Sequence, residues 1–125
     1  MAIVGIGTDL ARIARFRKFL EPDSRVLERL FSSTEREYAL AMHDPTPHLA
    51  ARFAAKEAFF KALGTGLRDG LTWQQVQVVR DQLGCPSLNL SGRAVELMAA
   101  RGATKAHLSY SHDGDYAVAT VILEK

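Results

Sequence analysis

One long helix in the middle of the chain constrains the fold more than any other segment. The stretch Leu49–Gly66 reads LAARFAAKEAFFKALGTG, and before Gly64 it contains no proline, glycine or β-branched residue. Alanine, leucine, lysine and glutamate are strong helix formers, and a glycine directly after such a run is a common helix stop. The sequence therefore predicts a long helix that ends at Gly64.

Apolar residues cover two sides of this helix. At about 100° per residue, Leu49, Phe53 and Phe60 form a narrow stripe, separate from a broader face of alanine, phenylalanine and leucine. We therefore expect the helix to be covered on two sides, by its own sheet and by another segment or subunit. Its only charged residues are Arg52, Lys56, Glu57 and Lys61.

Glu57 and Lys61 lie one helical turn apart, beside the narrow stripe. A simple salt bridge between residues i and i+4 is one interpretation of this pair. The other is a metal-binding carboxylate next to a phosphate-binding lysine. The second interpretation draws on the Gly64-Thr65-Gly66 loop, whose small residues let backbone approach an anionic ligand. The helix alone leaves both open.

The composition indicates one ordinary globular domain, residues 1–125, with 47% hydrophobic and 24% charged residues. The formal net charge of +2 gives no bulk argument for nucleic acid as a partner. No apolar run approaches the roughly 20 residues that span a bilayer, so we expect no membrane association. The single Cys85 excludes an internal disulfide and favours a reducing, cytoplasmic location.

The amino-terminal segment predicts a strand over Ala2–Gly7 and then a helix to about Leu20. Asp9 would lie at the junction, where capping the helix is its ordinary role. The glycines at positions 5 and 7 suggest a dinucleotide-binding turn, but Leu10 stands where a third glycine is needed, so we set that interpretation aside. Arg12 and Arg15 give the predicted helix a basic flank, which is either solvated or a docking surface for an acidic partner.

The remaining patterns predict a mainly antiparallel α+β fold. A capping box at Ser32 and Glu35 opens a helix, and a hairpin turns at Asp113-Gly114. We expect helical residues near 26–31, 33–43 and 93–100, and strands over 76–80, 87–90, 105–111 and 116–123. This order places one sheet against the long central helix.

Three blocks of the sequence together resemble the holo-[acyl-carrier-protein] synthases, the small bacterial 4′-phosphopantetheinyl transferases. The blocks are Gly5-Ile6-Gly7-Thr8-Asp9, the run from Arg52 to Gly66, and Ser109-Tyr110-Ser111-His112 with Tyr116-Ala117-Val118-Ala119. They occur in the family's order and spacing. The resemblance implies the 4′-phosphopantetheinyl transferase fold, a typical homotrimer with active sites at subunit boundaries, and a role in fatty acid biosynthesis.

The implied reaction moves the 4′-phosphopantetheine arm of coenzyme A to a serine of apo acyl carrier protein and leaves adenosine 3′,5′-bisphosphate. Such a transfer depends on in-line positioning and charge neutralisation, for which Mg²⁺ held by carboxylates is suited. Asp9 and Glu57 match the family's metal-binding pair, and Lys61 matches its pyrophosphate-binding lysine. Glu57, directly or through a metal-bound water, is the implied route for the serine proton.

The resemblance assigns further contacts residue by residue. Arg52 and His112 match positions that contact the coenzyme's phosphates in some members, and Gly64, Thr65 and Gly66 match the loop that lines its nucleotide. Arg15 matches an arginine that meets the acidic recognition helix of the carrier protein. Two departures stand out: Arg12 replaces a common glutamate and makes the docking surface more basic, and Cys85 replaces a common lysine and removes one phosphate contact.

Two other functions use the same residues. A Mg²⁺-dependent phosphoesterase would need Asp113 and Asp115 beside Asp9 and Glu57, because such hydrolases usually gather three or more carboxylates. A non-catalytic module would use only the basic first segment, to bind an acidic protein or RNA. A hydrolytic triad of Ser111, His112 and Asp113 is excluded, because adjacent strand residues point to opposite faces.

Overall fold

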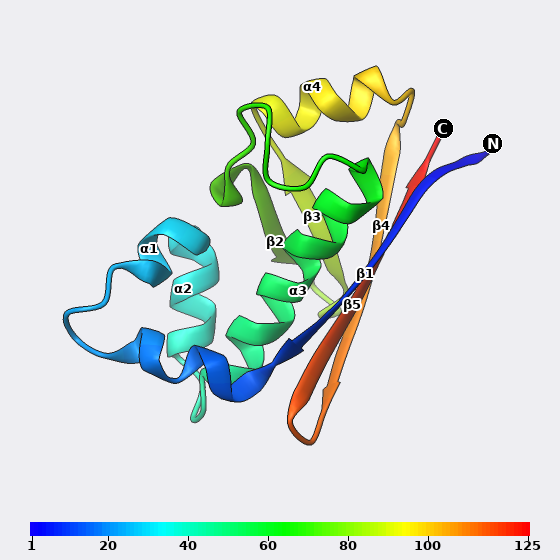
Figure 1. Cartoon of the computed structure of the whole chain (residues 1–125). Coiled ribbons are helices and arrows are strands. Elements are labelled where there is room, and N and C mark those ends of the chain that lie inside the picture. The colour runs from blue at the N-terminus through cyan, green and yellow to red at the C-terminus, as the bar shows by residue number, and fades with distance from the viewer.

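The fold is α+β, as predicted: a computed structural model describes residues 1–125 and places the long helix against an antiparallel sheet (Figure 1). The strands are β1 (Ile3–Arg12), β2 (Val76–Arg80), β3 (Pro86–Leu90), β4 (Lys105–Asp113) and β5 (Tyr116–Glu124). The helices are α1 (Val26–Leu30), α2 (Ser33–Leu40), α3 (Thr46–Leu63) and α4 (Arg93–Ala100). Short 3₁₀ turns η1 (Ile13–Phe16), η2 (Lys18–Leu20) and η3 (Trp73–Gln75) complete the chain.

The main sheet has three antiparallel strands in the order β1-β5-β4, and β2 and β3 pair separately. The first and last strands of the chain are therefore neighbours, with Gly7 opposite Val121 and Asp9 opposite Ala119. The hairpin of β4 and β5 extends two residues further toward its turn than the pattern predicted, and Asp113 pairs with Tyr116. The two chain ends consequently lie close together (Figure 1).

The α3 helix forms the centre of the core. It begins at Thr46, three residues before the predicted start, and ends as predicted at Gly64, which has a left-handed backbone with φ of 80°. Only Pro47, His48, Glu57 and Lys61 among its residues are not buried. The prediction that this helix is covered on two sides is confirmed.

The predicted junction at Asp9 is wrong. Strand β1 continues through Asp9 to Arg12, so Asp9 caps no helix, and the basic flank continues on the short turns η1 and η2. The β1 residues pair with β5 along this whole stretch. Cross-strand pairing therefore overrides the local pattern that suggested a helix.

Glycines let β1 lie directly on α3. A Cβ atom added to Gly7 would come within 2.0 Å of the Ala58 carbonyl oxygen, and one added to Gly5 within 2.2 Å of the Ala62 carbonyl oxygen. Small residues on both elements thus allow the backbones to approach. This packing explains the glycine pattern that resembles a dinucleotide turn, and it brings Asp9 over the helix.

A fully buried ion pair joins α3 to α2. Lys56 Nζ lies 2.8 Å from Glu35 Oε1 and donates to the Trp73 carbonyl oxygen at 2.9 Å. Glu35 also accepts from the backbone N–H groups of Ser32 and Val78, the first as part of the predicted capping box. All of these groups are hydrogen-bonded, as burial of charge requires.

One face of the main sheet carries no helix, because all four helices lie on the other side (Figure 1). Along β1 this open face presents Ile6 and Leu10, whose exposed fractions are 63% and 61%. Their cross-strand partners on β5 are Ile122 and Val118. The open face thus carries an apolar strip along β1 and β5, interrupted by the hydrogen-bonded Thr8 and Thr120, whereas β4 contributes polar residues such as His107 and Ser109. In addition, no helix of the structure is both long and apolar enough to cross a bilayer.

Candidate functional site

Asp9, Glu57 and Lys61 come together where β1 crosses α3. Lys61 Nζ lies 3.0 Å from Asp9 Oδ1 and donates to the Thr8 carbonyl oxygen at 3.1 Å. Lys61 therefore pairs with the strand, and no ion pair joins it to Glu57 within the helix. The salt-bridge interpretation of Glu57 and Lys61 is wrong. The structure instead gathers the three residues of the predicted catalytic set.

The surroundings of Glu57 disfavour the charged form of its carboxyl group. Partial burial raises the pKa of Glu57, the charge of Asp9 raises it further, and Lys61 and Arg15 oppose this rise. A carboxylate whose ionisation is disfavoured in this way gains from a nearby cation. A glutamate held in this way is also a better proton acceptor near neutral pH than a free surface glutamate.

The donor set at this point suits Mg²⁺. Two neighbouring carboxylates supply hard oxygen ligands, and Mg²⁺ commonly takes only one or two protein carboxylates beside waters and phosphate oxygens. The chain has no cluster of three or more His, Cys, Asp or Glu side chains. Asp113 and Asp115 therefore do not join the site, as the phosphoesterase alternative requires.

Arg52 and His112 belong to a second cluster, around Tyr38 and His48. Arg52 is 2% exposed, its guanidinium carbon lies 4.3 Å from the centre of the Tyr38 ring, and its Nη1 donates to the His48 carbonyl oxygen at 3.2 Å. The His48 ring is 5.8 Å from Tyr38 and 6.4 Å from His112. This cluster joins α2, the start of α3 and the end of β4.

The two clusters lie on different sides of α3. Arg52 and Glu57 are five residues apart, which corresponds to about 140° around the helix axis. Within one chain, the predicted phosphate contacts of Arg52 and His112 are therefore separate from the Asp9–Glu57–Lys61 set. The resemblance assigns all of these residues to one coenzyme, in active sites at subunit boundaries.

The basic residues after β1 surround a shallow depression of about 550 Å³. Arg12, Arg15, Arg17 and Lys18 line it, together with Ala14 and Glu21. Arg17 thus belongs to the same surface as Arg12 and Arg15. The Arg15 guanidinium rests on the Phe53 ring at 5.2 Å, one turn of α3 before Glu57. The depression therefore borders the carboxylate pair.

The loop after α3 has the predicted open backbone. Gly64 and Gly66 both have positive φ, and Thr65 Oγ1 donates to the Gly66 carbonyl oxygen. The loop follows Lys61 directly, so it borders the site. Cys85 lies exposed in the turn between β2 and β3, where its backbone N–H donates to Asp81.

Sequence reasoning missed three contributors. The Thr8 carbonyl oxygen holds Lys61, which no side-chain pattern could reveal. Tyr38 and Arg80 join the Arg52 cluster through a hydrogen bond of 2.5 Å between Arg80 Nη1 and the Tyr38 hydroxyl. Arg80 is the last residue of the strand predicted over 76–80. In the sequence this position indicates an exposed strand end and gives no sign of a specific role.

Comparison with known proteins agrees with this geometry. A family model described as the 4′-phosphopantetheinyl transferase superfamily matches residues 5–121. The holo-[acyl-carrier-protein] synthase of Syntrophotalea carbinolica is 58% identical over 121 residues, which cover 96% of this chain and 94% of the relative. That of Trichlorobacter lovleyi is 57% identical and covers 98% of both chains.

Solved structures show the same fold. The holo-[acyl-carrier-protein] synthase of Neisseria meningitidis superposes with a TM-score of 0.88 at 32% identity, covering 99% of this chain and all of that one. The Bacillus anthracis synthase in complex with CoA (3′,5′-ADP) gives 0.81 at 36% identity, covering 98% of this chain and 96% of that one. A Chronobacterium ammoniagenes synthase–CoA complex gives 0.84 at 34% identity, over 99% and 98%.

The fold, the paired carboxylates and these matches define the class: the chain belongs to the 4′-phosphopantetheinyl transferase superfamily. Within the superfamily it belongs to the holo-[acyl-carrier-protein] synthases, because full-length relatives of that name share more than half of its residues.

Proposed function

We propose that this enzyme transfers the 4′-phosphopantetheine group of coenzyme A to a serine of apo acyl carrier protein and releases adenosine 3′,5′-bisphosphate. The observation that carries the proposal is the convergence of Asp9 and Glu57 beside Lys61 in a member of the synthase family. The CoA-bound relatives support the coenzyme as co-substrate. The carrier partner follows from the shared family name.

The chemical step is one displacement at phosphorus. The serine oxygen of the carrier attacks the phosphorus that bears the pantetheine arm, and the bond from that phosphorus to the bridging oxygen of the pyrophosphate breaks. We assign removal of the serine proton to Glu57. Lys61 stabilises the negative charge that collects on the departing bisphosphate.

Asp9 and Glu57 would hold Mg²⁺ in the active enzyme. The ion supplies charge neutralisation and alignment for the pyrophosphate. Asp9 also orients Lys61 through their 3.0 Å contact, and the Thr8 carbonyl oxygen fixes the ammonium group from the strand side. These contacts keep the lysine near the carboxylates before the substrates arrive.

The open sheet face supports a homotrimer with its sites at subunit boundaries. Arg52 and His112 lie away from Glu57 within one chain, so a single subunit does not surround one coenzyme with all the predicted contacts. A neighbouring copy that covers the apolar strip of Ile6 and Leu10 would place its own Arg52 cluster toward the carboxylates. The Gly64–Gly66 loop would then line the nucleotide from the same side as Lys61.

The basic depression is the proposed carrier dock. It has four basic residues and one acidic residue and borders Glu57, so an acidic carrier bound there would present its serine to the site. The holo carrier that results is what fatty acid synthesis requires, and we assign the enzyme to that process in the cytoplasm.

Mixing the enzyme with coenzyme A, Mg²⁺ and apo acyl carrier protein tests the proposal. Mass spectrometry should show the carrier gaining phosphopantetheine in step with release of adenosine 3′,5′-bisphosphate. Asp9→Ala or Glu57→Ala should each lower turnover by at least about 100-fold, because charge stabilisation at the pyrophosphate is lost. Glu96→Ala, on the exposed side of α4, is the matched control. Bisphosphate release without any carrier would indicate a hydrolase and overturn the proposal.

Replacing Arg15 with glutamate should weaken carrier binding mainly through slower association, since charge reversal removes electrostatic steering. The Kd for the carrier should rise about tenfold or more at low salt, and the difference from wild type should shrink at high salt. Stopped-flow association at several salt concentrations measures this effect. Equal affinity of variant and wild type at low salt would place the dock elsewhere.

A further inference from the structure

Two arginines share one aromatic ring beside a pocket of about 360 Å³. The guanidinium carbons of Arg52 and Arg80 lie 4.3 and 5.1 Å from the centre of the Tyr38 ring. Arg80 Nη1 also donates to the Tyr38 hydroxyl at 2.5 Å. The pocket is lined by these three residues together with Thr34, Glu35 and two valines of β2.

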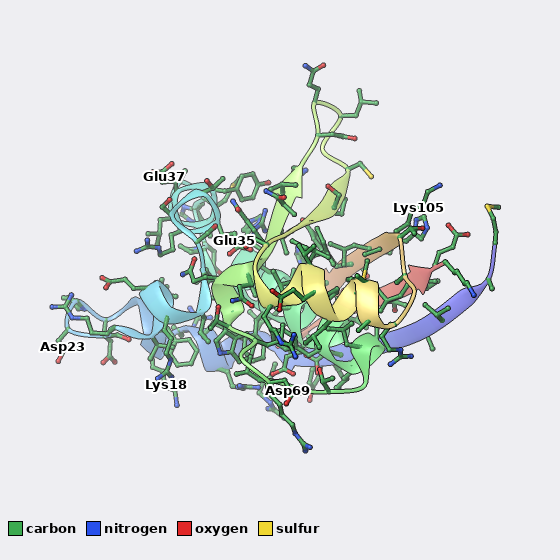
Figure 2. All side chains as sticks on the ribbon, turned by 90° about the horizontal axis from the view of Figure 1, so that it is seen from above. Lys18, Asp23, Glu35, Glu37, Asp69 and Lys105 are labelled. Carbon is green, nitrogen blue, oxygen red and sulfur yellow. The ribbon has the colours of Figure 1, made fainter.

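Neither arginine has an acidic partner. The five salt bridges of the chain involve neither Arg52 nor Arg80. Glu35, the one carboxylate in the lining, has both oxygens occupied by Lys56, Ser32 N–H and Val78 N–H. Figure 2 shows Glu35 turned from α2 toward the body of the molecule, whereas Glu37 on the same helix points away. The pocket therefore retains two uncompensated positive charges.

Arg52 also has an unused buried donor. Arg52 is only 2% exposed, and its Nε is buried without any hydrogen-bond partner. Buried donors of a charged group are nearly always satisfied, because leaving one unpaired is costly. Burial lowers the pKa of nearby His48, and the charges of Arg52, His112 and Arg80 lower it further. The charges around His48 are thus mainly positive, and only Asp44 opposes them.

Arg80 is held toward the same space from the β2–β3 turn. Its Nη2 would lie 2.7 Å from a Cβ atom placed on Gly84, so the guanidinium lies directly against this turn, where the positive φ of Gly84 favours glycine. The ring of Tyr38 aligns the two guanidiniums through cation–π contact, and planar guanidinium groups bind phosphate oxygens in pairs. Two such groups with no carboxylate between them match a dianionic phosphate monoester.

We propose that Arg80, aligned by Tyr38, acts with Arg52 as a specificity-determining residue for the 3′-phosphate monoester of coenzyme A. The inference rests on the proposed function for the identity of the co-substrate. It adds to the predicted phosphate contacts of Arg52 and His112 two residues that the resemblance does not assign. The exposed turn that carries Cys85 lies next to Arg80, so Arg80 supplies a cation at that end of the site.

Nucleotide binding to the full-length enzyme tests the inference by calorimetry with adenosine 3′,5′-bisphosphate, adenosine 5′-monophosphate and inorganic phosphate. Arg80→Gln should weaken binding of the bisphosphate about tenfold or more and leave binding of the 5′-monophosphate unchanged. Tyr38→Leu should give a loss in the same direction, because Arg80 and Arg52 lose their alignment. Arg25→Gln, an exposed arginine paired with Glu28, is the matched control and should change neither affinity.

Turnover provides a second readout. Arg80→Gln should raise the KM for coenzyme A and leave kcat within about twofold, because the interaction is uniform in ground and transition states. With dephospho-coenzyme A, which lacks the 3′-phosphate, variant and wild type should have equal kcat/KM.

Equal losses for the bisphosphate and the 5′-monophosphate, or no loss, would overturn the inference. Inorganic phosphate that binds as tightly as the bisphosphate and with the same dependence on Arg80 would also overturn the coenzyme assignment. A different result would show that the proposed function is wrong: the wild-type enzyme would then transfer no phosphopantetheine to the carrier, whatever its affinity for nucleotides.

Discussion

At the scale of single residues, the charges of α3 differ in function because they differ in burial. Lys56 is fully buried and paired with Glu35, so it stabilises the packing of α2 against α3. Lys61, one turn further and on another side, has a half-exposed side chain and pairs with Asp9. Glu57 has no ion-pair partner of its own, which leaves its carboxylate available to a metal ion and a proton.

Glu57→Gln should stabilise the metal-free protein at neutral pH. The raised pKa of Glu57 means that the folded protein keeps a proton which the unfolded chain has already released. The free energy of unfolding therefore falls as pH rises from the ordinary glutamate pKa through the raised value, and the loss persists above it. Glutamine carries no charge and avoids that loss.

Thermal unfolding in a chelator at a series of pH values measures this difference. The Tm of Glu57→Gln should exceed that of wild type at pH 7, and the gap should close toward about pH 4, where glutamate is protonated in both states. Glu37→Gln, on the outward side of α2, controls for the loss of one surface charge. A higher Tm for wild type than for Glu57→Gln at pH 7 without metal would contradict the assignment.

At the scale of elements, the contact between β1 and α3 builds the site. Asp9 reaches Lys61 only because β1 lies on the helix backbone, and Gly5 and Gly7 make that approach possible. The β1–β5 register then sets which β1 side chains face the helix and which face outward. The active carboxylates are therefore positioned by packing between two regular elements.

Gly7→Ala should destabilise the fold by about 3 kcal/mol, because its new methyl group would meet the Ala58 carbonyl oxygen at 2.0 Å. Denaturant unfolding measures the change. Gly102→Asn is the control, because its left-handed backbone suits asparagine and nothing lies within 4 Å of the added atom. We expect that control to stay within about 1 kcal/mol of wild type. Equal stability of Gly7→Ala and wild type would show that β1 does not need this close contact.

At the scale of the whole molecule, the proposed assembly would use the open sheet face to bring the two clusters of neighbouring copies together. Strand β1 leaves Ile6 and Leu10 exposed on this face, and large exposed apolar side chains on a sheet surface can mark a subunit contact. Covering that surface with another copy would bury the strip and complete the coenzyme site in one step. Assembly and activity should therefore be lost together.

Ile6→Lys should dissociate the enzyme and abolish transfer, because a lysine would be buried in the subunit contact. Sedimentation velocity should show the variant at monomer mass, whereas we expect wild type to sediment as the proposed trimer. Leu83→Lys, in the exposed β2–β3 turn at 94% exposure, is the matched control and should keep mass and activity. A monomeric Ile6→Lys with full kcat/KM would show that one subunit contains the complete site.

Much of the fold could be predicted because its signals are local. Helix propensity and Gly64 defined the end of α3, the capping box defined the start of α2, and Asp113-Gly114 defined the hairpin of β4 and β5. The stretch after Gly7 could not be assigned in this way. The sequence pattern there favours a helix, but the segment forms a strand because it pairs with β5. The residues of β5 lie more than a hundred positions away in the sequence.

The sequence by itself determined which chemical groups the enzyme has: two acids, a lysine and a glycine-containing loop, in an order and spacing that resemble one family. Only the tertiary structure decided which of them meet. It paired Lys61 with Asp9 instead of Glu57, buried Lys56 against Glu35, and separated Arg52 from the carboxylates by placing it on another side of α3. The reason is physical: sequence spacing fixes directions around one helix, whereas partners from distant segments depend on how closely the backbones pack.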